Sequence, residues 1–310
     1  MLKSFFRLIR WPNLLIVALT QYFLYHYLLV PAFKAAKLSA ILDYRHFSLL
    51  VLTTVLITAG GYIINDLTDF RIDLINKPHK VIINRAFKIQ TVYWMYFCLN
   101  FIGFLVALYL ALYVRNLPLV NIFPVAVAAL FMYSLRLKKE PLIGNLLIAA
   151  FCAGVAGIVW FAERKAFVAL TYRLPESAAY IQQLFVFYLL FAFLSTVFRE
   201  IVKDIEDMEG DGVGNYRTLP LVIGAEKSKW VAMAFALLLA LTLSYMLVLN
   251  QQSWGWEALV FAIGFIYLPL VIANYLLIRA KNKQQIRQVS HLAKFIMLSG
   301  ILLLLILVLS

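Results

Sequence analysis

The sequence predicts an all-α protein, a polytopic transmembrane bundle of nine helices that forms one domain over residues 1–310. Two observations lead to this fold class. First, 64% of the residues are hydrophobic and only 14% are charged, whereas soluble domains are about half apolar and about a quarter charged. Second, apolar stretches of about 20 residues, long enough to cross a bilayer, recur along the whole chain. Most of the surface is therefore expected to face lipid, in a single polytopic domain.

The hydropathy pattern places the expected spans and the connections between them. The first span follows a basic start, but it is long, aromatic-rich and has no small-residue cleavage pattern, so we expect it to be retained. Two connections, 69–89 and 204–228, are long and polar and carry Gly, Pro or Asn, which stop helices. They are expected to form two polar loops that cap a central cavity. The nine spans are 13–32, 47–68, 90–114, 117–135, 141–162, 180–203, 229–250, 255–278 and 290–309.

The basic residues predict the orientation. With a cytoplasmic N-terminus, 21 of the 28 Lys and Arg residues fall in cytoplasmic segments and seven fall outside. This bias is the positive-inside signal, and it puts both long loops on the cytoplasmic side of what we expect to be the cell inner membrane. Basic loops also suit anionic membrane lipids. The net charge of +13 comes without a basic tail or zinc-knuckle spacing, so no nucleic-acid partner is expected. Cys98 and Cys152 lie in apolar segments and imply no disulfide framework.

The acidic residues gather in two short windows, each where a span runs into a long loop. Nine of the fifteen Asp and Glu residues fall there. In both windows three aspartates follow the same spacing, and residues at i, i+3 and i+7 share one face of a helix. Each window is thus expected to present a stripe of carboxylates. The two stripes are Asp66, Asp69 and Asp73, and Asp204, Asp207 and Asp211.

Closely spaced carboxylates repel one another and require a counter-charge. Mg²⁺ suits them, because it takes one or two carboxylates, keeps waters and completes its shell with substrate phosphates. A single acidic cluster at a helix end is more often a solvated face. Two clusters with identical spacing on one side of the membrane instead favour a functional site. Cations that a diphosphate would require lie nearby: Lys77, Lys80, Lys138, Arg199, Lys203 and Arg217.

Several motifs resemble those of the UbiA-type intramembrane prenyltransferase superfamily, whose members have nine spans. Residues 65–73 read N-D-x-x-D-x-x-x-D and continue into Asn-Lys-Pro-His-Lys at 76–80. Residues 204–211 read D-x-x-D-x-x-G-D and are followed by Arg-Thr-Leu-Pro at 217–220. Tyr133-Ser134 with Lys138 is similar to the family's Y-S-x-x-x-K, and residues 10–13 are similar to its entry into the first helix. The matches cover nearly the full chain.

The resemblance implies that an isoprenyl diphosphate ionises and its prenyl group passes to an acceptor. The six aspartates would act in catalysis by holding Mg²⁺ on the diphosphate. Tyr133 would stabilise the allylic cation, although an aromatic residue at this place is more often an ordinary interfacial one. Asn13 would either contact substrate or cap the first helix. The residues implied to bind the diphosphate are Asn65, Lys77, Lys138, Lys203 and Arg217.

The sequence leaves more than one possible acceptor. The run at 199–207 is most similar to the digeranylgeranylglyceryl phosphate synthase-like branch, which implies a lipophilic, phosphate-bearing acceptor and fits the cytoplasmic cations. Aromatic quinone precursors are the alternative within the family. Lys80 stands where Arg is usual and Val81 where Pro is frequent, which bears on acceptor specificity. A divalent-cation transporter is the alternative of another class. Transporters hold ions near the bilayer midplane, however, whereas these aspartates lie at span ends beside many cations.

Overall fold

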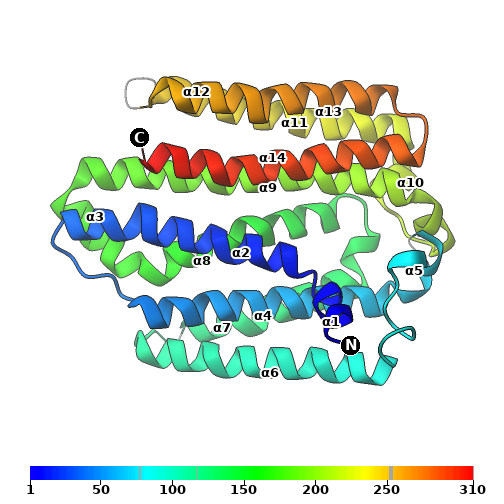
Figure 1. Cartoon of the computed structure of the whole chain (residues 1–310), viewed down its shortest axis with the longest axis horizontal. Coiled ribbons are helices and arrows are strands. Elements are labelled where there is room, and N and C mark those ends of the chain that lie inside the picture. The colour runs from blue at the N-terminus through cyan, green and yellow to red at the C-terminus, as the bar shows by residue number, and fades with distance from the viewer. Residues whose placement is uncertain (77, 117, 251–253, 310) are drawn as a thin grey trace.

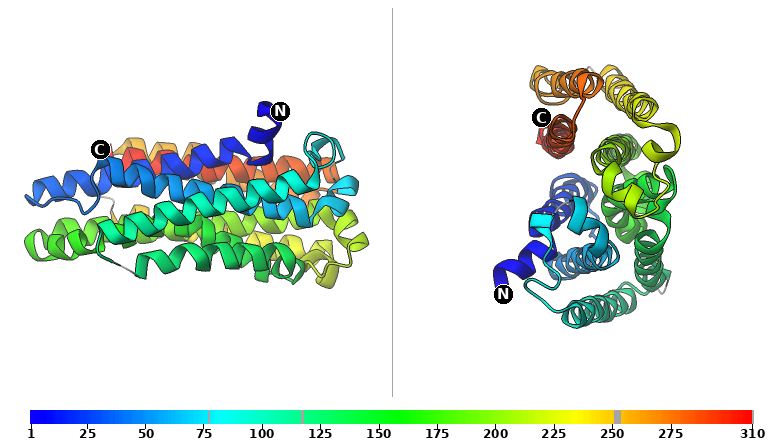
Figure 2. Two further views of the ribbon diagram at one scale, coloured as in Figure 1. Left: turned by 90° about the horizontal axis from the view of Figure 1, so that it is seen from below. Right: turned by 90° about the vertical axis from the view of Figure 1, so that its right-hand side faces the viewer.

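The computed structural model describes residues 1–76, 78–116, 118–250 and 254–309. Within these residues it has nine helical spans long and apolar enough to cross a membrane, as predicted. The spans run side by side along one axis, and short helices lie at their ends (Figures 1 and 2). Two spans contain a π-helical stretch: the first joins α2 (Trp11–Phe23), η1 (Leu24–Leu29) and α3 (Val30–Ala35), and the eighth joins α12 (Trp256–Ala262), η4 (Ile263–Tyr267) and α13 (Leu268–Arg279). The other spans are α4 (Tyr44–Thr68), α6 (Ile89–Tyr113), α7 (Pro118–Leu135), α8 (Ile143–Arg173), α9 (Pro175–Val213), α11 (Ala225–Leu249) and α14 (Lys283–Leu309).

Helix α9 is the centre of the packing. A larger share of it is buried than of any other span, and it packs most extensively against α8, α11 and α14. Phe191 and Phe198, on its membrane part, are almost fully buried in the main hydrophobic core. Helix α14 approaches α9 closely at Gly300, where an added Cβ would lie 2.0 Å from Cε1 of Phe191. The glycine is therefore what allows these two spans to meet.

Two spans are longer than the hydropathy pattern predicted. The prediction ended the fifth span at residue 162 and began the sixth at residue 180, but α8 continues to Arg173 and α9 starts at Pro175. Helix α9 also continues past residue 203 to Val213, so the second aspartate group lies on the helix and not in a loop. Hydropathy falls at Asp204, yet Ile205, Gly210 and Asp211 are buried. Tertiary burial sustains the helix there.

The first aspartate group does not lie on one straight helix, contrary to the prediction. Helix α4 ends at Thr68, Asp69 has φ −90° and ψ 0°, and α5 begins at Phe70 (α5, Phe70–Asn76). The expected loop after it contains a short 3₁₀ helix, η2 (Pro78–Lys80). The expected loop after α9 likewise contains a short helix, α10 (Leu219–Ile223). Helices α5 and α10 lie at the same end of the bundle as α1 (Leu2–Leu8) (Figure 1).

At the opposite end, a buried carboxylate holds the connection between the first two spans. Glu163 on α8 is fully buried. It accepts hydrogen bonds from the backbone N–H groups of Ile41 at 2.8 Å and Leu42 at 2.9 Å. The Tyr25 hydroxyl donates to the carbonyl oxygen of Leu42. These bonds satisfy backbone groups that would otherwise be buried without partners.

Candidate active site

Asp69 is the point at which three separate parts of the chain meet. Its carboxylate accepts a hydrogen bond from the Tyr216 hydroxyl at 3.0 Å, and Tyr216 lies just after α9. The same Oδ1 atom lies 2.6 Å from Nζ of Lys138, in the turn between α7 and α8. A backbone bond of 2.8 Å from the Arg217 N–H to the Lys139 carbonyl joins the last two parts. The fold thus brings the first aspartate group to the segment that follows the second.

The Lys138 ammonium is enclosed by oxygen atoms. Besides Asp69, it donates to Oγ1 of Thr68 at 2.8 Å and to Oδ1 of Asn65 at 3.2 Å. Only 7% of its side chain is exposed. Burial lowers the pKa of Lys138 below its ordinary value, and the charge of Asp69 opposes that shift. Two residues expected to bind diphosphate, Asn65 and Lys138, are therefore in contact.

Glycine at position 144 allows this lysine to reach the site. Lys138 lies in a short 3₁₀ helix, η3 (Leu137–Lys139), which packs against the start of α8. A Cβ at Gly144 would lie 2.7 Å from Cα of Lys138 and 3.0 Å from the carbonyl oxygen of Leu137. Because both contacts are with backbone, they could not be relieved by a change of rotamer.

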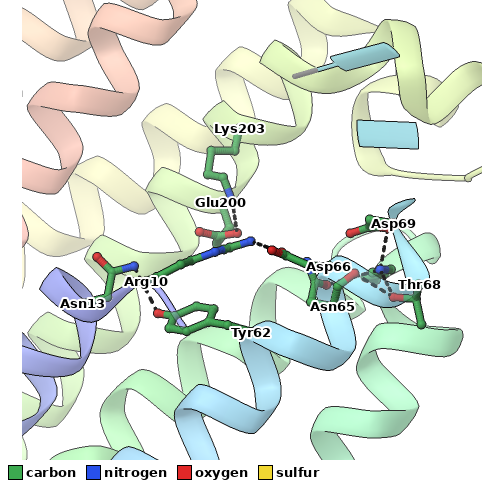
Figure 3. A network of polar contacts seen from close by, with 10 residues as sticks. Arg10, Asn13, Tyr62, Asn65, Asp66, Thr68, Asp69, Glu200 and Lys203 are labelled. Carbon is green, nitrogen blue, oxygen red and sulfur yellow. Dashed lines mark hydrogen bonds and ion pairs between the residues drawn. The ribbon is translucent and has the colours of Figure 1, made fainter. Parts of the chain in front are cut away.

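A second polar network centres on Arg10, which precedes α2 (Figure 3). Its guanidinium lies 2.6 Å from Oδ1 of Asp66 and stacks over the Tyr62 ring at 4.7 Å from the ring centroid. The side chain of Arg10 extends from a left-handed backbone conformation, φ 53°. Glu200 of α9 lies beside Arg10 in Figure 3 and itself pairs with Arg199 and Lys203. Arg10, Asp66 and Glu200 thus connect α2, α4 and α9.

The remaining aspartates surround these two networks. Asp204 accepts a hydrogen bond of 2.7 Å from Nδ2 of Asn145 on α8. Asp211 is buried, whereas Asp73 and Asp207 are half-buried. Tyr133, near the end of α7, is half-buried and within electrostatic range of Asp69 and Asp204. Among the described residues, no three His, Cys, Asp or Glu side chains converge closely enough to hold a metal ion by themselves.

The other predicted site residues that the structure describes have side chains that do not contact Asp69. Lys203 contacts Glu200 at 3.1 Å, and the side chain of Arg217 is exposed. Lys77 lies outside the described residues. Asn13 does not cap the first helix, because α2 has no side-chain cap bond; a contact between Asn13 and substrate stays a prediction. The Asn13 side chain donates to the Tyr62 hydroxyl and accepts from Nζ of Lys294, both at 3.2 Å.

Several residues that the structure places in the networks were not among the predicted site residues. Arg10 and Glu200 lay within the quoted motifs but received no role. Asn145 and Lys294 are polar residues inside apolar spans, and such residues are functional by default; that signal could have identified them. Tyr216 lies in a loop and gave no comparable signal.

Comparison with known proteins agrees with this arrangement. The model of the UbiA prenyltransferase family matches residues 15–300. The chain belongs to this family. Digeranylgeranylglyceryl phosphate synthase of Saccharolobus solfataricus is 30% identical over 308 residues, which cover 97% of this chain and 94% of the relative.

Two solved structures have the same fold as this UbiA prenyltransferase. One, from work on digeranylgeranylglyceryl phosphate synthase in membranes, has a TM-score of 0.64 and 26% identity and covers 99% of this chain and 98% of the other. A UbiA homologue from Archaeoglobus fulgidus, bound to DMAPP and Mg²⁺, has a TM-score of 0.53 and 13% identity and covers 97% and 99%. The chain is therefore an integral membrane protein and an intramembrane prenyltransferase.

Proposed function

We propose that the protein transfers a prenyl group from an isoprenyl diphosphate to a lipophilic acceptor that bears a phosphate, in a Mg²⁺-dependent reaction that releases pyrophosphate. The favoured acceptor is similar to geranylgeranylglyceryl phosphate, because a relative that matches 97% of this chain is a digeranylgeranylglyceryl phosphate synthase. The whole chain would act as one catalytic domain. Its active site would face the cytoplasmic side of the inner membrane, as the basic residues indicate.

The observation that carries the proposal is the position of Asp69 between Lys138 and Tyr216. A carboxylate beside a buried ammonium group gives a site both a metal ligand and a donor for a phosphate oxygen. In a transporter for a bare divalent cation, the Lys138 ammonium would repel the transported ion and weaken its binding. A diphosphate held through a metal would use both groups.

The carboxylates fit Mg²⁺ if substrate supplies part of the shell. Mg²⁺ takes one or two carboxylates and keeps waters or phosphates as its other ligands, so no site of three converged carboxylates is required. We assign this role to Asp66, Asp69, Asp73, Asp204, Asp207 and Asp211, of which Asp66 and Asp204 also hold Arg10 and Asn145. When bound, Mg²⁺ would neutralise negative charge on the departing pyrophosphate.

The chain's own residues would supply the other interactions. As the bond between the allylic carbon and the diphosphate oxygen breaks, Lys138 and Asn65 donate hydrogen bonds to the leaving pyrophosphate. Lys77, Lys203 and Arg217 add positive charge around it. The face of the Tyr133 ring stabilises the allylic cation. The acceptor oxygen then forms the new bond to the allylic carbon and loses its proton to solvent or a neighbouring carboxylate.

An acceptor panel tests this function. Purified protein is given Mg²⁺, a labelled isoprenyl diphosphate and one acceptor at a time, including geranylgeranylglyceryl phosphate and quinone precursors, and pyrophosphate release is measured. We expect turnover with the phosphate-bearing acceptor, its loss with EDTA, and a fall of about 10²-fold or more in Asp69→Asn and Asp207→Asn. Asp43→Asn is the matched control, because Asp43 caps α4 at the opposite end.

Three results would decide against the proposal. Turnover with aromatic acceptors alone would assign the quinone-precursor reaction instead. Full activity in Asp69→Asn would remove the carboxylate from the mechanism. Metal flux into proteoliposomes without any prenyl substrate would support a transporter.

A further inference from the structure

Lys294 is a charged residue inside a membrane span. It lies eleven residues after the start of α14, which is about 16 Å along the helix axis. Its Nζ atom donates to Oδ1 of Asn13 at 3.2 Å. Among the described residues, no carboxylate lies within ion-pair distance of Lys294. Holding a half-buried lysine in a span without an anionic partner costs free energy, and such residues often mark functional sites.

The surroundings of Lys294 raise this cost further. The Arg199 guanidinium on α9 is close enough to act on Lys294 electrostatically, and the two like charges repel. The amide of Asn13 is fixed with its oxygen toward Lys294, because its nitrogen donates to the Tyr62 hydroxyl at 3.2 Å. The protein thus holds the ammonium in place without neutralising it.

The neighbouring carboxylates already have cationic partners. Asp66 pairs with Arg10, and Glu200 pairs with both Arg199 and Lys203. Three cations therefore share these two carboxylates, and neither carboxylate forms an ion pair with Lys294. An anion bound beside Lys294 would balance the excess positive charge.

The position of this cluster suits the second substrate. Tyr62, which orients Asn13, precedes Asn65 of the Lys138 cluster by three residues on α4. That separation is about 4.5 Å along the helix axis. Lys294 is therefore linked, through Asn13 and the Tyr62 hydroxyl, to the same helix that carries Asn65 of the Lys138 cluster.

We propose that Lys294, oriented by Asn13 and supported by Arg199, binds the phosphate group of the acceptor and determines specificity for phosphate-bearing acceptors. The inference rests on the proposed function and assigns the acceptor end of that site. A phospholipid head group of the membrane has the same phosphate chemistry, so the experiment must separate the two sources.

The kinetic test compares Lys294→Gln with Lys294→Arg and with Arg279→Gln. Arg279 is an exposed cation at the end of α13, stacked on Tyr275, and is a matched control outside the site. Loss of one charge-assisted hydrogen bond should raise the KM for geranylgeranylglyceryl phosphate about 10- to 100-fold in Lys294→Gln. The KM for isoprenyl diphosphate should stay unchanged, Lys294→Arg should restore most of the loss, and Arg279→Gln should behave as wild type.

With geranylgeranylglycerol, which lacks the phosphate, Lys294→Gln and wild type should have equal KM values. An equal rise of KM with both acceptors would overturn the proposal.

A binding measurement gives a readout that needs no turnover. A dialkylglyceryl phosphate should raise the Tm of wild-type protein in detergent but not that of Lys294→Gln; equal stabilisation of both would overturn the proposal. Phosphatidylcholine vesicles with and without phosphatidylglycerol separate the two sources. If Lys294→Gln abolishes stabilisation by phosphatidylglycerol but leaves the KM for geranylgeranylglyceryl phosphate unchanged, the site holds a membrane lipid and the acceptor assignment fails. Absence of turnover with every acceptor would defeat the proposed function, and the Tm comparison would still decide the role of Lys294.

Discussion

Replacement of Lys138 by methionine separates the catalytic role of this residue from its structural one. Methionine keeps much of the apolar stem and removes the ammonium of a side chain that is only 7% exposed. The change deletes three hydrogen bonds, to Asn65, Thr68 and Asp69. It also leaves the Asp69 carboxylate, which is 17% exposed, with the Tyr216 hydroxyl as its remaining side-chain hydrogen-bond donor among the described residues.

The expected loss of stability follows from those contacts. Removal of one partner from a buried ion pair costs about 3–5 kcal/mol. Asp69 keeps the Tyr216 bond and some solvent access, so the lower end, about 3 kcal/mol, applies. The effect on catalysis is separate: loss of one preorganised donor to a developing anion lowers kcat about 10²- to 10³-fold.

Two measurements on the same preparation distinguish these effects. Thermal unfolding in detergent, followed by tryptophan fluorescence, reports stability. Pyrophosphate release per folded molecule, with saturating Mg²⁺ and substrates, reports kcat. Wild-type turnover per folded molecule in Lys138→Met would refute the assignment of Lys138 to the leaving group, whatever the change in Tm.

Three further predictions use other parts of the structure. Because burial lowers the pKa of Lys138, this group loses its proton at a lower pH than an ordinary lysine, and activity should fall as pH rises through that pKa. Lys138→Arg keeps its charge and should move this alkaline limb of the pH–rate profile to higher pH. An unmoved limb would show that another group causes the alkaline loss of activity. Glu163→Gln keeps one acceptor oxygen for the two N–H groups of Ile41 and Leu42 and should lower the free energy of unfolding by about 1–3 kcal/mol. Turnover per folded molecule should stay unchanged, because residue 163 lies about 27 Å along α8 from Asn145. Reduced turnover would contradict this separation of position 163 from the site. Gly300→Ala places a Cβ 2.0 Å from the Phe191 ring and should lower the free energy of unfolding by about 1–3 kcal/mol. The control Gly154→Ala, with no heavy atom within 4 Å of its Cβ, should not destabilise the protein. Equal Tm values for the two variants would show that the packing of α14 does not depend on close approach at position 300.

The sequence was informative wherever function or topology followed from local pattern. Runs of apolar residues predicted all nine spans because lipid requires them at a fixed minimum length. The aspartate spacing predicted two groups of carboxylates, and the Tyr-Ser motif led to Lys138. The spacing failed at Asp69, where α4 ends, because periodicity assumes a helix that is not interrupted.

Pairings between distant residues could not be predicted in this way. Arg10 and Asp66 are 56 residues apart, and Asn13 and Lys294 are 281 residues apart. Such partners depend on which helices pack together, which no single-sequence pattern specifies. Helix α9 gives a related case: its hydropathy falls at Asp204, but burial against neighbouring helices, not its own apolar content, extends it to Val213.

The two aspartate groups differ in how firmly the fold holds them. Those on α9 belong to a continuous helix of 39 residues, about 58 Å long, that is packed on several sides by other spans. They cannot shift without moving the centre of the protein. Asp73 lies beyond the helix break at Asp69, on a helix of seven residues. The aspartates on α9 are therefore fixed in the core of the bundle, whereas Asp73 lies on a short helix beyond a break. We expect any adjustment to substrates of different size to occur at α5.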